Sequence, residues 1–257
     1  MKLTLNTKDK IMKFNVLFQN LKAFTEYINL YVSKDGIYIQ GMDPSQCSCF
    51  ECKLANNWFD SYNYELENEK ETVGINTIIL QKILGIYVDT QTLEISVDNN
   101  ADNLYISFVN GDNIIDKYFE IPLVEIDSEL LDIKSDESNV DLTVVSKDYC
   151  DLINQLYIFN DALSLEFDES SVNFLAKGSD GTMKVNINLD DFVEYAIEED
   201  FQLKQTYNIR HITLICLFSK LNQHCIMKYS DDRPMEAKYN LENDSYVVFY
   251  LAPKIVD

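Results

Sequence analysis

The residue types that could do chemistry are abundant in this chain, but they are not grouped as a catalytic site requires. The sequence has 43 acidic residues among 257, so carboxylate groups such as Asp190-Asp191 and Glu198-Glu199-Asp200 are expected by chance. Acid-base catalysis commonly places a carboxylate beside a histidine, a lysine or a phosphate-binding loop. Neither group has such a neighbour in the sequence, and Asp231-Asp232 precedes Arg233-Pro234, which predicts a turn. We therefore predict that the protein is not an enzyme.

The six cysteines come closest to a metal motif at Cys47, Cys49 and Cys52. In a strand, the first two side chains face one side and Cys52 faces the other, so the three do not converge on one ion. Asp98–Asn103 resembles the start of a calcium loop, but Asn103 and Val109 stand where such a loop needs glycine and glutamate. We predict no metal, no other cofactor and reduced thiols.

The chain carries a formal charge of −22, from 43 acidic and 21 basic residues. Spread evenly, this charge would exclude a phosphate-bearing partner, whereas a curved or ring-shaped protein can be acidic outside and basic on one inner surface. The length allows one large domain or two of about 130 residues. Residues 1–4 alternate as a strand does, and apolar runs are short, so we expect a soluble intracellular protein without a membrane span.

Helical periodicity occurs in four short segments of a chain otherwise dominated by strand alternation. We expect helices at about Lys10–Phe24, Thr77–Ile86, Lys147–Phe159 and Arg210–Leu221. Asn76 or Thr77 is the expected N-cap of the second and Ser146 that of the third. The fourth would bury Leu214, Ile215, Phe218 and Leu221. This mixture of helices and strands predicts an α+β fold.

The apolar positions of these segments repeat. Leu17, Phe18, Leu21 and Phe24 recur 135 positions later as Leu152, Ile153, Leu156 and Phe159. Ile79, Leu80 and Ile83 match Leu214, Ile215 and Phe218 at the same offset, and Ile37 and Ile39 match Val172 and Phe174. Such a repeat predicts a duplicated domain of about 130 residues.

Between the copies, residues 123–139 follow Pro122 and are rich in acids and serine, which predicts an extended connector that packs partly onto the body or receives a partner. Leu93–Val97 and Leu104–Phe108 predict a hairpin around the turn at 98–103. Ile115–Ile121 and Met183–Leu189 predict half-buried strands whose exposed edges would pair between subunits.

The end of the chain is unusually apolar. Tyr246–Phe249 predicts a strand, and Tyr250-Leu251-Ala252-Pro253-Lys254-Ile255 follows it, where a terminus is normally frayed and polar. An exposed tyrosine, alanine and proline at a strand end would form a small apolar ledge of the kind that serves for docking. A last strand tucked onto the core is the alternative.

Several motifs together resemble the proliferating cell nuclear antigen family of DNA sliding clamps. They are the C-terminal Tyr250–Ile255, the segment Gly36–Ser45 with sequence GIYIQGMDPS, and Asn100–Leu104 with sequence NADNL. The resemblance covers the whole chain, including the duplication and the connector.

The resemblance implies a DNA clamp fold, with clamp domains at 1–122 and 140–257 joined by a connector at 123–139. It implies a homotrimeric ring with helices lining the hole and sheets outside, which encircles double-stranded DNA without reading its sequence. Such a ring tethers DNA polymerase and other proteins with clamp-binding motifs, is opened by an ATP-dependent loader and acts in the nucleus. A protist or a large DNA virus would suit the composition, and a viral chain would act in a viral replication compartment.

The basic residues of the helices are the candidates for DNA contact, through phosphates and not base edges. They are Lys13, Lys22, Lys82, Arg210 and Lys220; we expect Arg210, Thr213 and Lys220 to share one face of the fourth helix. The third helix departs from the family, because Asp151, Asn154 and Ile158 stand where arginines are typical. Three copies at −22 each would carry −66, so we expect weak net attraction to DNA.

The resemblance also implies a pocket for a short partner peptide and a trimer interface. The pocket residues would be Met42, Gln46, Cys47, Cys49, Leu131, Ile133, Pro234, Tyr250, Ala252 and Pro253. The interface residues would be Ile115, Lys117, Phe119, Met183, Val185 and Ile187. Gln46 and Cys47 replace a histidine and an aliphatic residue that are common in the family, so partner preference would differ. The alternative function is a clamp-fold subunit of a heterotrimeric checkpoint or transcription-associated clamp.

Overall fold

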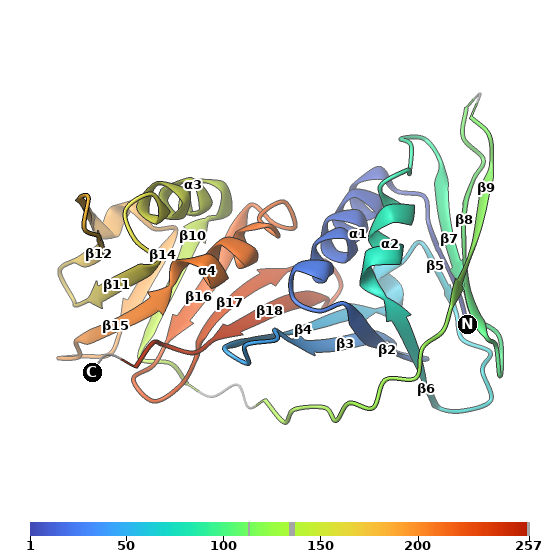
Figure 1. Cartoon of the computed structure of the whole chain (residues 1–257), viewed down its shortest axis with the longest axis horizontal. Helices are drawn as coiled ribbons and strands as arrows, with labels where there is room; N and C mark the ends of the chain where they lie inside the picture. The colour runs from blue at the N-terminus through green and yellow to red at the C-terminus, as the bar shows by residue number, and fades with distance from the viewer. Residues whose placement is uncertain (113, 134–136, 256–257) are drawn as a thin grey trace. The chain divides into compact units, whose positions relative to one another are not determined.

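The computed structural model describes residues 1–112, 114–133 and 137–255, which form two compact units (Figure 1). Unit 1 is built from Met1–Pro44, Glu51–Leu131 and Leu241–Val247, and unit 2 from Ser45–Phe50, Asp132–Asn240 and Val248–Asp257. Residues 134–136 of the predicted connector and 256–257 lie outside the described residues. Each unit combines two helices with two antiparallel sheets.

Unit 1 contains the first half of the secondary structure. Its elements are β1 (Lys2–Leu5), α1 (Lys8–Asn20), η1 (Leu21–Ala23), β2 (Tyr27–Ser33), β3 (Gly36–Met42), most of β4 (Ser48–Ala55), η2 (Asn56–Trp58), β5 (Ser61–Asn63), β6 (Lys70–Asn76), α2 (Thr77–Leu84), β7 (Thr92–Ser96), β8 (Asn103–Val109) and β9 (Lys117–Pro122). The strand orders are β5-β1-β7-β8-β9 and β4-β3-β2-β6.

Unit 2 repeats this arrangement. Its elements are β10 (Val140–Val145), α3 (Ser146–Tyr157), β11 (Ala162–Phe167), β12 (Val172–Lys177), β13 (Thr182–Ile187), η3 (Leu189–Asp191), β14 (Glu194–Ile197), β15 (Leu203–Asn208), α4 (Ile209–Cys216), β16 (His224–Tyr229), β17 (Met235–Asn240) and most of β18 (Tyr246–Leu251). Its strand orders, β14-β10-β16-β17-β18 and β13-β12-β11-β15, match those of unit 1 strand for strand. The predicted duplication and the α+β class are confirmed.

The helices form because their apolar residues recur at helical spacing and their ends are held by other segments. Ile11, Phe14 and Phe18 of α1 are buried, and the rings of Phe14 and Phe18 lie 4.3 Å apart. Burial of this face accounts for most of the stability of so short a helix. In each unit the two helices pack against each other, α1 on α2 and α3 on α4 (Figure 1).

The predicted N-cap of α2 is confirmed, and that of α3 is wrong. Asn76 caps α2, since its Oδ1 accepts from Ile78 N at 2.9 Å and Ile79 N at 3.0 Å. Ser146, expected as the cap of α3, is instead its first residue, and its hydroxyl donates to Asn222 O at 2.8 Å. The hydroxyl therefore bonds to a neighbouring loop and does not cap the backbone amides of its own helix.

The predicted repeat offset was wrong for the second helix pair. Asn76 and Asn208 both cap their helices, and the buried Leu80 and Ile212 follow each by four residues, so α2 and α4 are related by 132 positions and not by 135. The two offsets differ by three residues, which is close to one helical turn. The apolar stripes of α2 and α4 therefore also align at the wrong offset of 135. Helix α4 ends at Cys216, and Leu214 is only half-buried.

Candidate functional site

Of the predicted DNA contacts in unit 1, two lysines are exposed and one is held in ion pairs. Lys22 in η1 and Lys82 in α2 are exposed. The Lys13 side chain is only 18% exposed, with its Nζ 2.6 Å from Asp9 Oδ2 and 3.8 Å from Glu242 Oε1. Two carboxylates neutralise Lys13, which argues against a contact between this residue and phosphate.

In unit 2 the cations predicted to contact DNA lie at the start of α4 and beyond its end. Arg210 is exposed in the first turn of α4, and a hydrogen bond to Tyr157 together with the charge of Asp161 raises its pKa further. Lys220 is exposed but lies beyond the end of α4, so the shared helical face expected with Arg210 is wrong for Lys220. Sequence reasoning missed Lys147, an exposed residue at the start of α3, because the residues around it indicate only a helix start.

The exposed face of α3 is as poor in positive charge as expected. Asp151, Asn154 and Ile158 are all exposed, with Ile158 at 79%. An acid, an amide and an isoleucine offer no attraction to phosphate. Of the described cations on or beside α3 and α4, only those at 147, 210 and 220 are exposed.

Three strands of unit 1 anchor the start of the predicted connector. Val124 N donates to Gly74 O on β6 at 2.9 Å, and Asn29 Nδ2 on β2 donates to Ile126 O at 3.0 Å. On β3, Gln40 Oε1 accepts from Leu131 N at 2.6 Å while its Nε2 donates to Leu131 O at 3.1 Å. Gln40 therefore binds Leu131 much as a neighbouring strand would. The expectation that part of this segment packs onto the body is confirmed for residues 123–131.

Two of the predicted pocket residues come together in unit 1. Met42 and Leu131 are both exposed and line one hollow of about 210 Å³ with Tyr31 and Gln40. An apolar recess with a few polar groups is the usual form of a peptide-binding surface. Neither hydrogen bond of Gln40 to Leu131 closes this hollow, so its apolar side chains stay accessible.

The other pocket candidates belong to unit 2. Ala252 N donates to Cys47 O at 3.0 Å, which joins the tail to the segment before β4. Ala252, Gln46, Cys47 and Pro234 are exposed, whereas Cys49, Ile133 and Pro253 are half-buried. Tyr250, expected to be exposed, is buried at 7% exposure because it belongs to β18 and not to the tail. The apolar ledge therefore begins at Ala252.

The two predicted subunit edges lie at the ends of their sheets. In unit 1, β9 is the last strand of its sheet, and in unit 2 β13 is the first. Met183, Val185 and Ile187 are half-buried and alternate with exposed residues. Such edges offer backbone groups to a further strand.

Two residues of the β9 edge differ from expectation. Ile115, at 84% exposure, precedes the strand, which begins at Lys117. Lys117 Nζ donates to Gln91 Oε1 at 3.2 Å and Ile86 O at 3.3 Å, so this lysine is engaged within unit 1. Phe119 packs edge-on against Phe108, with ring centroids 5.4 Å apart.

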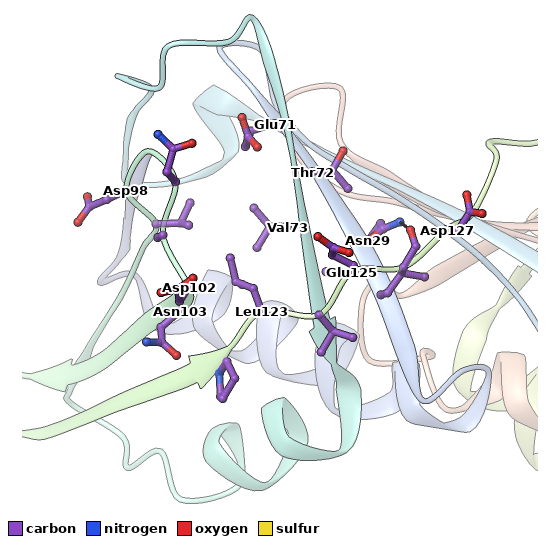
Figure 2. Close-up of a pocket in the computed structure, with 17 residues that line it drawn as sticks. Asn29, Glu71, Thr72, Val73, Asp98, Asp102, Asn103, Leu123, Glu125 and Asp127 are labelled. Carbon is purple, nitrogen blue, oxygen red and sulfur yellow. Dashed lines mark hydrogen bonds between the residues drawn. The ribbon is translucent and has the colours of Figure 1, made fainter.

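A hollow of about 770 Å³ lies in unit 1 between β6, the turn at 98–103 and the start of the connector. Figure 2 shows Asp98 and Asp102 on the side of the turn and Glu125 and Asp127 on the side of the connector. Glu71 adds a fifth carboxylate. The residues that line the hollow include no lysine or arginine. This hollow repels phosphate, so DNA contact must be sought elsewhere.

Within the described residues, no three histidine, cysteine or acidic side chains are grouped so that they could hold a metal ion. Cys49 is half-buried on β4 whereas Cys52 is fully buried, as expected for opposite faces of a strand. The helices of the described chain are all too short or too polar to cross a membrane.

Two family models match the chain in succession. The N-terminal domain of proliferating cell nuclear antigen matches residues 5–130, and the C-terminal domain matches residues 132–254. Together with the duplicated α+β topology, these matches define the class of protein as one with the DNA clamp fold. The chain belongs to the proliferating cell nuclear antigen family, whose members are DNA polymerase sliding clamps and replication proteins.

Similar proteins come from distant organisms. "Proliferating cell nuclear antigen 1" of Plasmodium falciparum (isolate K1 / Thailand) is 25% identical, over 94% of this chain and 93% of its own length. "Proliferating cell nuclear antigen 2" of Drosophila melanogaster is 22% identical over 92% of each. "DNA polymerase sliding clamp" of Thermococcus onnurineus (strain NA1) is 24% identical, over 96% of this chain and all of its own. The chain is a divergent member of the family.

Proposed function

We propose that the protein is a homotrimeric sliding clamp that encircles double-stranded DNA, without sequence specificity, and acts as a processivity factor and recruitment platform. The observation that carries this proposal is the match of two clamp-domain models to almost the whole chain. The exposed edges of β9 and β13 support the trimer, because one can pair with the other in a head-to-tail ring. In each chain, residues 1–122 and 140–257 would be the clamp domains, joined by the connector at 123–139.

The proposed DNA contacts are the exposed cations on or beside the helices. They are Lys22, Lys82, Arg210 and Lys220, with Lys147 added and Lys13 left out because of its ion pairs. A trimer would carry −66, three times −22, so these contacts would have to act against an overall repulsion. Topological linkage would then hold the ring on DNA more than affinity does.

The proposed partners are DNA polymerase and other proteins that carry a clamp-binding motif, together with an ATP-dependent loader. The residues proposed to bind their peptide are Met42 and Leu131 in unit 1, which line one hollow, and in unit 2 the residues Gln46, Cys47, Cys49, Ile133, Pro234, Ala252 and Pro253. Tyr250 is not part of the exposed surface, because it is buried in β18. The protein itself would catalyse no reaction and would act in the nucleus, or in a viral replication compartment if the chain is viral.

The first experiment measures assembly and retention. Light scattering should give the mass of three chains, and a loader-dependent assay should show longer products with polymerase. Rings loaded on circular DNA should remain there at moderate salt and be lost from the same DNA after linearisation. A monomer that needs other chains would favour a heterotrimeric clamp, and equal retention on both DNA forms would contradict topological holding.

The second experiment tests the peptide surface. Leu131→Ser and Ile133→Ser should each weaken binding of a clamp-binding peptide about tenfold or more, the equivalent of about 1.4 kcal/mol. Ile255→Ser is the matched control, since this isoleucine is 94% exposed and lies past the proposed surface. Tyr250→Ala is unsuitable, because loss of a buried aromatic ring would destabilise unit 2 itself. Unchanged affinity in both serine variants would contradict the assignment.

A further inference from the structure

Two of the six cysteines lie together on neighbouring helices of unit 2. Cys150 on α3 donates from its Sγ to the carbonyl oxygen of Cys216, the last residue of α4, at 3.8 Å. The thiol of each also shifts the pKa of the other. The sequence alone does not pair them, because positions 150 and 216 are 66 residues apart and come together only when α3 packs on α4.

Both thiols border a hollow of about 350 Å³. Lys147, Asp151 and Asn154 of α3 and Thr213 of α4 also line it, so charged and polar groups border the two thiols. Cys216 is half-buried and Cys150 is buried, yet both belong to the lining. A reagent that enters the hollow therefore reaches a pair of sulfur atoms.

The environment makes the two thiols chemically unequal. The hydrogen bond from the Cys216 thiol lowers the pKa of Cys150, and another from Ser219 acts in the same direction. The same bond, together with burial, raises the pKa of Cys216. Of the two thiols, Cys150 therefore more readily provides the thiolate that thiol chemistry requires. By contrast, burial raises the pKa of Cys225 to about 12.

We propose that Cys150 and Cys216 form a dithiol site that exchanges with small disulfides of the glutathione class and closes into a disulfide between α3 and α4. The Cys150 thiolate attacks one sulfur of the small disulfide, which forms a mixed disulfide and releases one small thiolate. That thiolate accepts the proton of Cys216, whose sulfur then attacks Cys150 Sγ and releases the second small thiolate. The protein loses two hydrogens, and two small thiols are produced from one small disulfide once the second thiolate has taken up the Cys150 proton.

The site has a structural consequence that does not depend on the proposed function. A disulfide between residues 150 and 216 closes a long loop, and it restrains the unfolded chain as well as the packing of α3 on α4. It needs the two Cβ atoms to lie about 3.5–4.5 Å apart, a separation that the packing of α3 on α4 sets, since rotation of the side chains moves only the sulfur atoms.

The test uses the full chain without denaturant in buffers with increasing ratios of oxidised to reduced glutathione. After acid quenching, intact mass should show the loss of two hydrogens, and peptide mapping should find Cys150 joined to Cys216. Cys216→Ser should instead carry one glutathione on Cys150. Cys47→Ser is the matched control, because Cys47 is exposed and distant in sequence, and it should form the cross-link as the wild type does.

Two results would overturn the proposal. One is a wild-type protein in which Cys47 takes up glutathione while Cys150 and Cys216 stay reduced or react separately. The other is a cross-link from Cys150 to Cys225 in place of Cys216. Because the wild-type measurement alone decides between these outcomes, a folding defect in the serine variant leaves the test intact.

Discussion

In unit 1 the chain leaves β9 and runs along the free edge of β6, whereas in unit 2 it leaves β18 and runs along the free edge of β15. Val124 N donates to Gly74 O at 2.9 Å in the first case, and Lys254 N donates to Thr206 O at 2.7 Å in the second. These strands are equivalent in the duplicated fold. The start of the connector and the C-terminal tail are therefore the same structural element, used twice.

The difference between the two exits lies in how closely the chain approaches. A Cβ atom added to Gly74 would lie 2.0 Å from Val124 O, far inside van der Waals contact. Thr206 has a side chain at the equivalent position and still accepts its hydrogen bond. The connector thus requires glycine beneath it, whereas the tail does not. The two copies of this element therefore keep the same backbone hydrogen bond but differ in the space that they leave for a side chain on the strand beneath.

The largest expected effect comes from closing that space in unit 1. Gly74→Ala should destabilise the protein by about 2–3 kcal/mol, because the added methyl group must displace the Val124 carbonyl or move β6. Urea unfolding at fixed protein concentration measures the change. Amide exchange at Val124 should also accelerate, since its acceptor moves away.

Thr206→Ala is the matched variant in unit 2. It removes a half-buried side chain without creating a clash, so it should cost less than about 1 kcal/mol and leave exchange at Lys254 unchanged. Equal losses in the two variants would mean that the two exits are held in the same way and would contradict a steric difference between them.

The starts of the equivalent helices α1 and α3 differ in a similar manner. Asp60 accepts from Asn6 N at 2.7 Å, Thr7 N at 2.8 Å and Lys10 Nζ at 3.0 Å, so it holds the start of α1 from a distant strand end. Burial alone would raise the pKa of Asp60, but these hydrogen bonds outweigh it and lower the pKa to about 2. In α3, Val145 precedes the helix and offers no such group.

Acid should therefore weaken unit 1 through Asp60. Its folded pKa is below the unfolded value, so its contribution is complete above about pH 4 and is lost as the pH falls toward 2. The contribution is about 2 kcal/mol at most, and Asp60→Asn should remove it at neutral pH and flatten the profile below pH 4. Asp148→Asn, an exposed acid in the first turn of α3, is the control. An equal flattening in that variant would contradict the role given to Asp60.

A smaller effect is expected where the connector leaves unit 1. Gln40→Ala removes both hydrogen bonds to the backbone of Leu131, each worth about 0.5–1.5 kcal/mol, and water can replace them at this exposed place. We expect a loss of about 1 kcal/mol and faster amide exchange at Leu131, with exchange at Val124 unchanged. The control is Gln202→Ala, which changes an exposed glutamine of unit 2 and should alter neither the stability nor the exchange at Leu131. Faster exchange at Val124 in Gln40→Ala would show instead that the connector detaches as one piece.

The sequence predicts the duplicated fold well because buried apolar positions recur with clear periods in both halves. Phe18 and Ile153 were paired correctly, since both must fill the space under a helix. The register of α2 and α4 was missed because a three-residue shift preserves a helical stripe. The anchoring of the connector by Gly74 and Gln40, and the pairing of Cys150 with Cys216, depend on contacts between residues far apart in the chain. No local pattern marks such contacts.

The smallest expected effects compare the cations of the two units. Lys82→Ala in unit 1 and Arg210→Ala in unit 2 should each lower the slope of log affinity for duplex DNA against log salt by up to about 1 for each phosphate that the variant no longer neutralises. Lys204→Ala changes the net charge as much as Lys82→Ala does, but this lysine lies on β15 beside Glu166 and should leave the slope unchanged. If Lys204→Ala reduces the slope as well, DNA responds to the overall charge and not to the helices. If only one of the two helix variants does, the duplicated helix pairs have divided the task, and one of them alone contacts DNA.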